Sequence, residues 1–357
     1  MDCALIGCGT IARSHLRGLR RMRPDARIHL VDVDRQRAET LASGSAITSI
    51  HTDIDAFLND VRPDTVHVLT PPPTHAMIAE KALNVGSHLF IEKPVTERAE
   101  QYAELAELAR EKKRILCADY STLGMPVVMR ALKEIHSGAF GKLVAVHCVF
   151  AGSEGGGVIP YGFSGHWAYF LRGGILQNNI DHPASLVLAV MDEIEEQHVS
   201  IVRRNILPYD CPDLIQISLR SRDQVGNITL SLGHGAHDRR AHFLLEGGTI
   251  TIDIARQLYS SVKSRGPQSF VEKATSGIAE GCALAGGTIK NTISALTGKL
   301  QRDPGIMNVM ASFYQAVEGN GKPIVSDSVV RKVTRFLDVV WSQVDYQPTN
   351  AEKRRMG

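Results

Sequence analysis

The chain has 357 residues, about twice the size of a typical domain, so we expect two domains. Its 40 lysines and arginines nearly balance its 38 aspartates and glutamates, which gives no electrostatic reason to expect a nucleic-acid partner. The six cysteines have no metal-binding spacing and no apolar run is long enough to span a bilayer, so we expect no metal site, no membrane span and a reducing, cytoplasmic setting.

The first 120 residues alternate short apolar strands with amphipathic helices. The expected strands are CALIG, RIHLVD, AITSI, TVHVLT, SHLFIE and RILCAD. Helices are expected between them, near residues 11–22, 34–42, 53–59, 74–85 and 96–112. Strands that alternate with helices pair in parallel through right-handed crossovers. Residues 1–120 are therefore predicted to form a doubly wound, Rossmann-type α/β domain.

A different pattern begins at residue 121. MPVVMRALKEIHSGAFG reads as a helix that ends at Gly138, and KLVAVHCVF as the next strand. After a glycine-rich segment and another helix, strands are expected in EQHVSIVRR, DLIQISLRS, GNITLSL, AHFLLEG and GTITIDI, the last two joined by a hairpin. Consecutive strands with short turns favour an antiparallel sheet, so residues 121–357 are predicted to form an α+β domain.

Residues 267–345 read as helical, and the segment 267–305 contains mostly small and apolar residues. Its glycines argue against one continuous helix. A packing or oligomer element is the favoured interpretation, with association at a membrane surface as the alternative.

The first predicted strand leads into a turn of the form GxGxxA. Gly7 permits the tight turn, Gly9 lets the backbone approach a pyrophosphate, and Ala12 keeps the following helix close to the strand. The start of that helix supplies backbone donors for the phosphates. The candidate contacts between and beside the glycines are Cys8, Thr10 and Ile11.

Acidic residues end the second predicted strand. The carboxylate of Asp32 is placed to accept hydrogen bonds from both hydroxyls of an adenine ribose and to repel a 2′-phosphate. Asp34 is expected to cap the next helix instead. This pattern predicts NAD as the cofactor, whereas Arg35 and Arg37 are the features that would favour NADP.

Several motifs, in order, resemble those of the Gfo/Idh/MocA family of oxidoreductases (the glucose–fructose oxidoreductase and inositol dehydrogenase type). They are the N-terminal GxGxxA, VLTPPPTH, IEKP, ALKEIHSGAFGKLVAVH, GGILQNNIDH and FYQAVEGNGKPIVSDSVVRKVTRFLDVVWSQ. The resemblance implies a nicotinamide cofactor in the first domain. It also implies a sugar, cyclitol or sugar nucleotide held against an open-faced sheet of the second, substrate-binding domain.

The resemblance also implies roles for particular residues. Thr70, Pro71 and Pro72 would form a shelf beside the cofactor, with His75 near it. Lys93 would be the catalytic lysine, and Glu92, on the cofactor side, would orient it or counter its charge. Burial beside a cationic ring disfavours the charged form of an amine, so a lysine there would serve as the base that takes the hydroxyl proton.

In the second domain the resemblance implies that His182 faces the substrate. Counting from GG, the position that the family usually gives to aspartate is Asn178, which has no proton to exchange and would orient hydroxyls within the catalytic site. Asp181 either substitutes for that aspartate or caps a helix whose first turn contains Pro183. Tyr161 and Trp167 are candidate sugar contacts.

These patterns predict an NAD-dependent dehydrogenase of a UDP-hexose-type sugar nucleotide, oxidised at C3. The choice of substrate follows from the resemblance, because asparagine at the position of Asn178 is similar to what is found in family members that form 3-keto sugar nucleotides. Three alternatives stay open: a dehydrogenase of a free sugar or cyclitol, a non-catalytic NAD-binding sensor or assembly protein, and, by resemblance to some family members, an enzyme that cleaves a glycosidic bond through transient oxidation. A homo-oligomer, dimer or tetramer, is expected.

Overall fold

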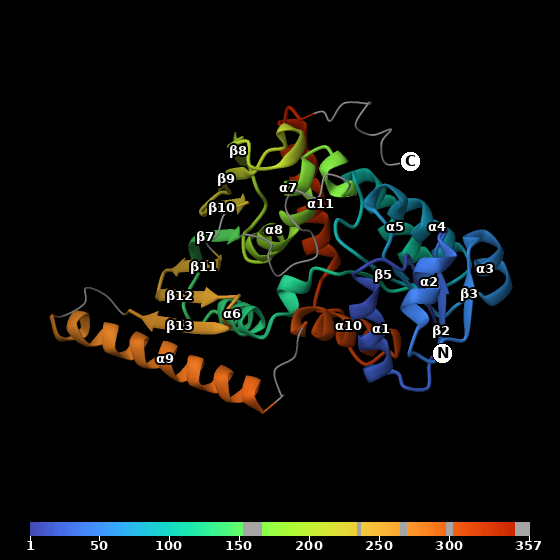
Figure 1. Ribbon diagram of the computed structural model, residues 1–357. Coiled ribbons are helices and arrows are strands. Elements are labelled where there is room, and N and C mark those ends of the chain that lie inside the picture. The colour runs from blue at the N-terminus through green and yellow to red at the C-terminus, as the bar shows by residue number, and fades with distance from the viewer. Residues whose placement is uncertain (153–165, 234–236, 265–269, 298–302, 347–357) are drawn as a thin grey trace. The chain divides into compact units, whose positions relative to one another are not determined.

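The computed structural model describes residues 1–152, 166–233, 237–264, 270–297 and 303–346 (Figure 1). The chain divides into two compact units. Unit 1 contains residues 1–121 and 305–339, and unit 2 contains residues 122–304 and 340–357. The sequence-based division had placed residues 305–339 in the second domain, whereas the structure groups them with unit 1.

Unit 1 is built on a six-stranded parallel sheet with the strand order β3-β2-β1-β4-β5-β6. The strands are β1 (Asp2–Ile6), β2 (Arg27–Val31), β3 (Ser49–His51), β4 (Thr65–Val68), β5 (His88–Ile91) and β6 (Leu116–Ala118). The alternating helices are α1 (Ala12–Met22), α2 (Arg35–Ala42), α3 (Ile54–Val61), α4 (His75–Asn84) and α5 (Ala99–Glu111). This order confirms the predicted Rossmann sheet.

Two later helices complete unit 1. They are α10 (Pro304–Val317) and most of α11 (Asp327–Ser342). Tyr314 of α10 lies against the sheet, with its hydroxyl 3.2 Å from Thr65 Oγ1 of β4. The central strands are apolar on both faces, as a covered parallel sheet requires. Because strand order reverses between β1 and β4, the loops after these strands diverge at the carboxyl edge, where ligands bind in such sheets.

Unit 2 is built on a seven-stranded sheet with the order β13-β12-β11-β7-β10-β9-β8. The strands are β7 (Leu143–Gly152), β8 (Glu196–Val202), β9 (Leu214–Arg220), β10 (Val225–Leu232), β11 (Asp238–Leu245), β12 (Gly248–Asp253) and β13 (Leu258–Lys263). All pairs are antiparallel except β7 with β10, so the prediction of a largely antiparallel sheet is confirmed. The predicted hairpin joins β11 to β12.

The edge strand β13 was not among the predicted strands. Its sequence, LYSSVK, contains two serines and a lysine and shows no clean alternation of apolar residues. The strand forms because Tyr259 and Ser260 pair with Ile252 and Thr251 of β12. Tertiary pairing thus overrides a weak local signal.

The two faces of the seven-stranded sheet differ sharply. One face is apolar and is covered by α6 (Pro126–His136) and α8 (Asp181–Leu188), with Phe243, Ile250 and Ile252 fully buried beneath them. On the other face a row of polar residues crosses all seven strands in register. The row is Ser260, Thr251, His242, His147, Asn227, Ser218 and His198. The sheet is therefore open-faced, as expected.

Helix α9 (Phe270–Leu296) is continuous over 27 residues, so the expectation that its glycines would break it is wrong. Gly287 explains in part why the helix is continuous despite its glycines. A Cβ atom at this position would lie 3.0 Å from Leu258 Cδ2 of β13, so a glycine lets the helix pack closely against the strand. Tertiary contact here outweighs the low helix propensity of glycine, which is only about 1 kcal/mol per residue.

Candidate active site

The turn after β1 is shaped by its two glycines. Gly7 has a φ of +97°, and a Cβ atom there would lie 2.7 to 2.8 Å from backbone atoms of Leu69 and Thr70, so no other residue fits. A Cβ atom at Gly9 would meet nothing within 4 Å. The backbone at Gly9 is therefore open to an approaching group.

The start of α1 continues this opening. Ala12 is fully buried in the first turn, and no side chain caps the helix at Ile11. Thr10 is exposed beside it, whereas Cys8 is buried. Uncapped N–H groups at a helix start form a site for an anion, so the turn fits the pyrophosphate of a dinucleotide.

The carboxylate of Asp32 is held beside this turn. Its Oδ2 atom accepts a hydrogen bond from the N–H of Cys8 at 2.7 Å, and its Oδ1 atom accepts one from the N–H of Asp34 at 2.9 Å. Each oxygen keeps a lone pair for a further donor. Burial and the charge of Asp32 together raise the pKa of the Cys8 thiol to about 12, so this thiol stays protonated.

The residues after Asp32 are engaged with one another. Asp34 caps α2 by accepting hydrogen bonds from the N–H groups of Gln36 and Arg37, which confirms its predicted role. The guanidinium of Arg37 also lies 3.3 Å from Asp34, and that of Arg35 lies 2.8 Å from Glu39. Both arginines that would favour a 2′-phosphate therefore have acidic partners.

The loops after β4 and β5 are joined by His75. One ring nitrogen lies 2.6 Å from the carbonyl oxygen of Thr70 and the other 2.9 Å from that of Pro94. Burial lowers the pKa of the His75 imidazole, so the neutral ring donates to one of these carbonyls. His75 is 1% exposed, which makes it a residue that holds the loops together. Pro71 of the predicted shelf is exposed and Pro72 is buried.

Lys93 is the second residue after β5. Its backbone N–H donates to Glu92 Oε2 at 3.0 Å, and the Lys93–Pro94 peptide bond is cis. The other oxygen of Glu92 lies 3.2 Å from His15 Nε2. Glu92 therefore links the backbone of Lys93 to a side chain inside the unit, which is consistent with its expected role in orienting the lysine.

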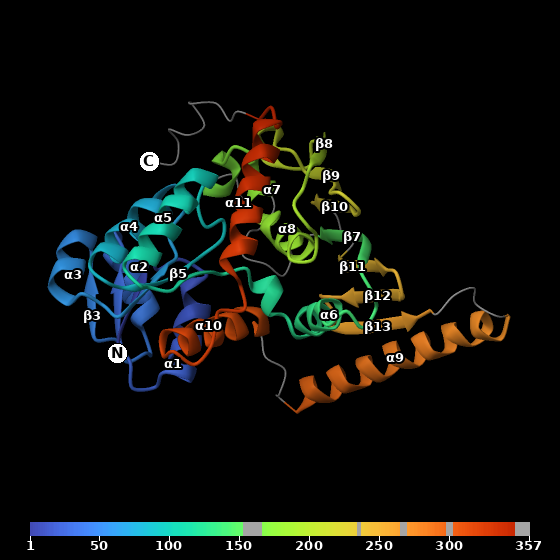
Figure 2. The ribbon, with the colours of Figure 1, turned by 180° about the vertical axis from the view of Figure 1, so that it is seen from behind.

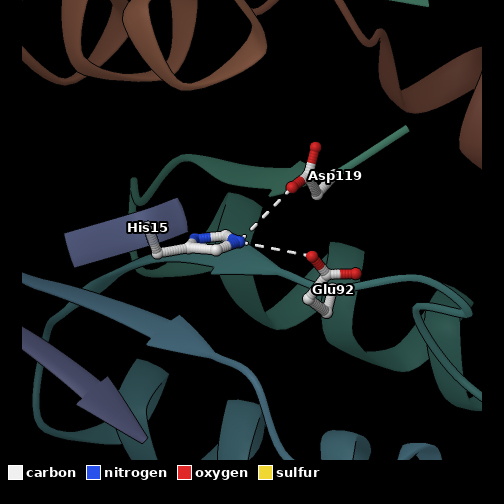
Figure 3. Close-up of side chains that lie close together, drawn as sticks. All are labelled: His15, Glu92 and Asp119. Carbon is white, nitrogen blue, oxygen red and sulfur yellow. Dashed lines mark hydrogen bonds and ion pairs between the residues drawn. The ribbon is translucent and has the colours of Figure 1, made fainter. Parts of the chain in front are cut away.

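His15, Glu92 and Asp119 form a buried charged cluster at the carboxyl ends of the strands (Figure 3). Asp119 Oδ2 lies 3.5 Å from His15 Nε2, and His15 is fully buried. Burial by itself would lower the pKa of His15, but the two carboxylates outweigh it and raise this pKa to about 9. Burial and the charge of Glu92 raise the pKa of Asp119 to about 6. At neutral pH an imidazolium is shared between two carboxylates.

A chain of hydrogen bonds leads from His15 into the core. His15 Nδ1 lies 2.9 Å from His67 Nδ1, and His67 Nε2 lies 2.8 Å from the Tyr314 hydroxyl. Burial and the charge on His15 hold the pKa of His67 well below its usual range. The protonated His15 therefore donates to neutral His67, which donates to Tyr314, so the ring nitrogens of both histidines are satisfied.

The same three groups have the chemistry of a metal site. Ligand atoms of His15, Glu92 and Asp119 all lie within 4.8 Å of one another, and histidine with carboxylates binds divalent cations. A proton on His15 satisfies the same atoms without an ion. We interpret the cluster as an ion-paired network on this ground.

His15 and Asp119 were not among the predicted site residues. Asp119 follows β6 at the edge where β5 also ends, and this position was an available signal. His15 lies in the second turn of α1, and no local pattern distinguishes it from an ordinary helix residue.

The predicted substrate residues of unit 2 lie around α7 (Gly174–Asn179) and α8. A Cβ atom on Gly173 would lie 2.3 Å from the Trp341 ring, and one on Gly174, whose φ is +56°, would lie 2.3 Å from Cys211 Sγ. Both glycines are thus required by packing. The helix is interrupted at Ile180, and α8 contains Pro183 in its first turn, as expected.

The predicted substrate residues around α7 and α8 differ in burial and in their contacts. His182 is half-buried, with Nδ1 3.1 Å from Thr122 Oγ1 and its ring parallel to that of Phe150. Asp181 is 1% exposed in the first turn of α8, where a helix dipole favours a carboxylate, and it is not the N-cap. Asn178 and Trp167 are half-buried. Tyr161 lies outside the described residues.

The predicted site residues thus fall into two groups. The cofactor residues, Glu92 and Lys93 belong to unit 1, and Trp167, Asn178, Asp181 and His182 belong to unit 2. Joint action of Lys93 and His182 on one substrate stays a prediction.

This cofactor-type turn on a doubly wound parallel sheet is typical of a dinucleotide-binding domain. Residues 1–120 match the model of the Gfo/Idh/MocA oxidoreductase family with an NAD-binding Rossmann fold. Residues 1–120 are therefore similar to the NAD-binding domain of that family.

Two curated relatives with at least 30% identity match over less than half of their own length. The chain is 38% identical to an uncharacterized oxidoreductase of Schizosaccharomyces pombe over 95 residues, which is 27% of this chain and 26% of that protein. It is 30% identical to scyllo-inositol 2-dehydrogenase (NAD(+)) of Bacillus subtilis over 141 residues, or 39% of this chain and 41% of that protein.

Solved structures match over nearly the whole chain. The WlbA dehydrogenase of Bordetella pertussis, in complex with NADH and UDP-GlcNAcA, has a TM-score of 0.76 at 15% identity and covers 96% of this chain and 95% of that one. UDP-N-acetylglucosamine 3-dehydrogenase of Acidithiobacillus ferrooxidans has a TM-score of 0.70 at 17% identity, with 96% of each chain covered. At these identities the likeness establishes the fold.

No helix within the described part of the chain has the length and apolar character to cross a membrane.

Proposed function

We propose that the protein is an NAD-dependent dehydrogenase that moves a hydride between the cofactor and a secondary alcohol of a sugar nucleotide. The observation that carries this proposal is the arrangement within unit 1. The open turn at Gly9, the oriented carboxylate of Asp32 and the anchored backbone of Lys93 all lie at loops that follow strands at one edge of the parallel sheet. Ligands bind at this edge in open α/β sheets.

In this proposal the chain supplies binding and proton transfer, and bound NAD supplies the hydride acceptor. Lys93 takes the proton of the substrate hydroxyl as the hydride leaves the same carbon, and returns a proton in the reverse direction. Glu92 holds the backbone of Lys93, and the imidazolium of His15 fixes Glu92 in turn. Such support keeps a catalytic group in its working geometry.

The preference for NAD over NADP follows from charge. Both oxygens of Asp32 already accept backbone hydrogen bonds, so its orientation toward the cofactor turn is fixed. A 2′-phosphate beside this carboxylate would be repelled. Arg35 and Arg37, which could offset that repulsion, are paired with Glu39 and Asp34.

The preference for a sugar nucleotide rests on fold-level likeness and on one residue. The B. pertussis neighbour is in complex with UDP-GlcNAcA, and the A. ferrooxidans neighbour is a UDP-N-acetylglucosamine 3-dehydrogenase. Asn178 orients substrate hydroxyls without exchanging a proton, which leaves proton transfer to Lys93 with His182 assisting. The relation to scyllo-inositol 2-dehydrogenase makes a free cyclitol or sugar the second candidate substrate.

The test combines one variant with a substrate panel. Lys93→Met keeps the length of the side chain and removes the amine, so turnover should fall at least about 100-fold while NAD affinity changes little. Lys81→Met, at an exposed lysine paired with Asp55, is the matched control and should retain wild-type turnover. NADH formation at 340 nm is followed with UDP-hexoses, free hexoses and cyclitols.

The outcomes separate the alternatives. Turnover only with free polyols would overturn the sugar-nucleotide assignment and keep the enzyme class. NAD binding without turnover on any substrate, and with cellular function unchanged in Lys93→Met, would show a non-catalytic NAD-binding protein instead.

A further inference from the structure

Helix α9 lies against the open face of the unit 2 sheet at its β13 edge (Figures 1 and 2). The contacts on its inner side are polar or small. Ser260 of β13 donates to Glu280 at 3.2 Å, and Asn291 Nδ2 donates to the carbonyl oxygen of Arg256 at 2.7 Å. Gly287 packs on Leu258. Residues 280, 287 and 291 thus define the side of α9 that faces the sheet.

Most of the exposed apolar residues of α9 lie on its other side, whereas Leu284, 38% exposed, lies nearer the inner side. Ile278 is 67% exposed, Ile289 59%, Ile293 55% and Leu296 83%, and Cys282 is exposed with them. At 3.6 residues per turn, this outer stripe points roughly 170° away from residues 280, 287 and 291. A surface helix normally turns its apolar stripe toward its own core. The reversed orientation of α9 indicates a partner outside the chain.

The part of the outer stripe from Ile278 to Ile293 is self-complementary, whereas Leu296 lies opposite Thr275. Residues at equal distances from a midpoint between 285 and 286 form similar pairs: Ile278 with Ile293, Cys282 with Ile289, and Ala285 with Gly286. A two-fold axis through this midpoint would place each residue opposite its counterpart on an antiparallel copy of the same helix. The small residues at the centre would let the two helices approach closely.

The charge of α9 favours a protein partner over a membrane surface. Its 27 residues include two acidic and two basic side chains, Glu272, Glu280, Lys273 and Lys290. Helices that lie on membranes carry a polar face rich in lysine and arginine, which attracts anionic lipid. The inner face of α9 instead contains Glu280 and Asn291, both bonded to the sheet region.

The area available also bears on the partner. A helix of this length presents a strip about 40 Å long and 10 Å wide, or about 400 Å². A stable interface buries about 800 Å² on each partner, so α9 supplies about half of one. The open face of the sheet, with exposed Val144 and Leu244, is the adjoining surface of the same unit that can supply the rest.

We propose that α9 is a homodimerisation element, which pairs in antiparallel fashion with α9 of a second copy of this chain through the stripe from Ile278 to Leu296. The proposal is independent of the catalytic activity. It also accounts for the exposed apolar side chains of α9 and for its glycines, which lower the intrinsic stability of the helix.

The first experiment tests the stripe by charge. Ile289→Asp places a carboxylate on each side of the two-fold axis, and the dimer dissociation constant should rise on the order of 100-fold or more. Met77→Asp, at an apolar residue of unit 1 that is 49% exposed, is the matched control and should leave assembly unchanged. Sedimentation velocity over a concentration series measures both, and circular dichroism checks folding.

The second experiment tests the register. In the background Cys282→Ser, the change Ala285→Cys should give a cross-linked dimer on mild oxidation, because the two thiols lie within about 1.5 Å of each other along the axis. Native Cys282 should not cross-link, since its two copies are about 10 Å apart along the axis. The other five cysteines are buried and do not interfere.

Each contrary result overturns the proposal. A wild-type monomer at 50 µM, or a dimer unaffected by Ile289→Asp, would exclude α9 as the dimer contact. Cross-linking of native Cys282 without cross-linking at 285 would show parallel pairing. Wild-type binding to anionic vesicles that Ile289→Asp abolishes would assign the stripe to a membrane surface.

Discussion

Replacement of His15 by glutamine tests the buried charged cluster most directly. Glutamine fills similar space but has no charge, so Glu92 and Asp119 would face each other without a cation. The pKa of His15 in the folded protein is about 9, against an ordinary value of 6.5 for histidine. At about 1.4 kcal/mol per pH unit, this difference corresponds to roughly 3 kcal/mol of stability.

The sign of the pH dependence is fixed by the direction of this shift. A histidine whose pKa is raised in the folded state contributes its full stability below pH 6.5, and this contribution is lost as the pH rises through about 9. The wild type should therefore lose stability between these two values. His15→Gln should lie roughly 3 kcal/mol below the wild type at pH 6 and approach it above pH 9.

Thermal unfolding of both proteins between pH 6 and 9.5 measures this effect. Unit 1 has 156 residues, from 121 in the first segment and 35 in the second. For a domain of this size 1 kcal/mol shifts the midpoint by about 2–4 °C, so we expect a loss of about 6–12 °C at pH 6. Asp119→Asn removes the first of the two carboxylates that raise the pKa of His15 and keeps the 3.2 Å pair between His15 and Glu92, so it should give part of the stability loss of His15→Gln at pH 6 and a shallower pH slope than the wild type.

A midpoint within 2 °C of the wild type at pH 6, with the alkaline slope retained, would refute the assignment of an imidazolium at His15. Dialysis against a chelator tests the alternative that His15, Glu92 and Asp119 bind a metal ion. It should leave the wild-type midpoint unchanged, and a drop comparable to that of His15→Gln would show that the three groups hold a cation.

Three further predictions follow from the glycines and from Asp32. Gly7→Ala should destabilise unit 1 by about 3 kcal/mol or more, because the φ of Gly7 is +97° and a Cβ atom would lie 2.7 Å from the backbone of Leu69. Gly9→Ala should leave the unfolding midpoint nearly unchanged, since its Cβ atom would meet no protein atom within 4 Å, and should weaken NAD binding at least about tenfold. Equal losses of stability in the two variants would contradict this contrast. Asp32→Asn should weaken NAD binding by about tenfold and lower the ratio of the dissociation constants for NADP and NAD, both measured by fluorescence titration. An unchanged ratio would show that Asp32 does not contact the adenine ribose. Gly173→Ala should lower the stability of unit 2 by about 3 kcal/mol or more in urea, since a Cβ atom would lie 2.3 Å from the Trp341 ring, and wild-type stability would show that this ring has room to move.

The sequence by itself determined the features that depend on neighbouring residues. Gly7, Gly9 and Asp32 lie within one strand–turn–helix–strand segment, so their spacing predicted the cofactor turn. Asp34 as a helix cap and Pro183 in a first helical turn were predictable for the same reason, because backbone geometry over three or four residues decides both.

Other features were decided by the tertiary structure. His15, Glu92 and Asp119 are separated by 77 and 27 residues, and they meet because the sheet order places the end of β5 between those of β4 and β6, beneath α1. No local pattern contains that order. The pairing of β13 and the orientation of α9 depend likewise on contacts across the sheet, where hydrogen bonds and close packing override weak or opposing local propensities.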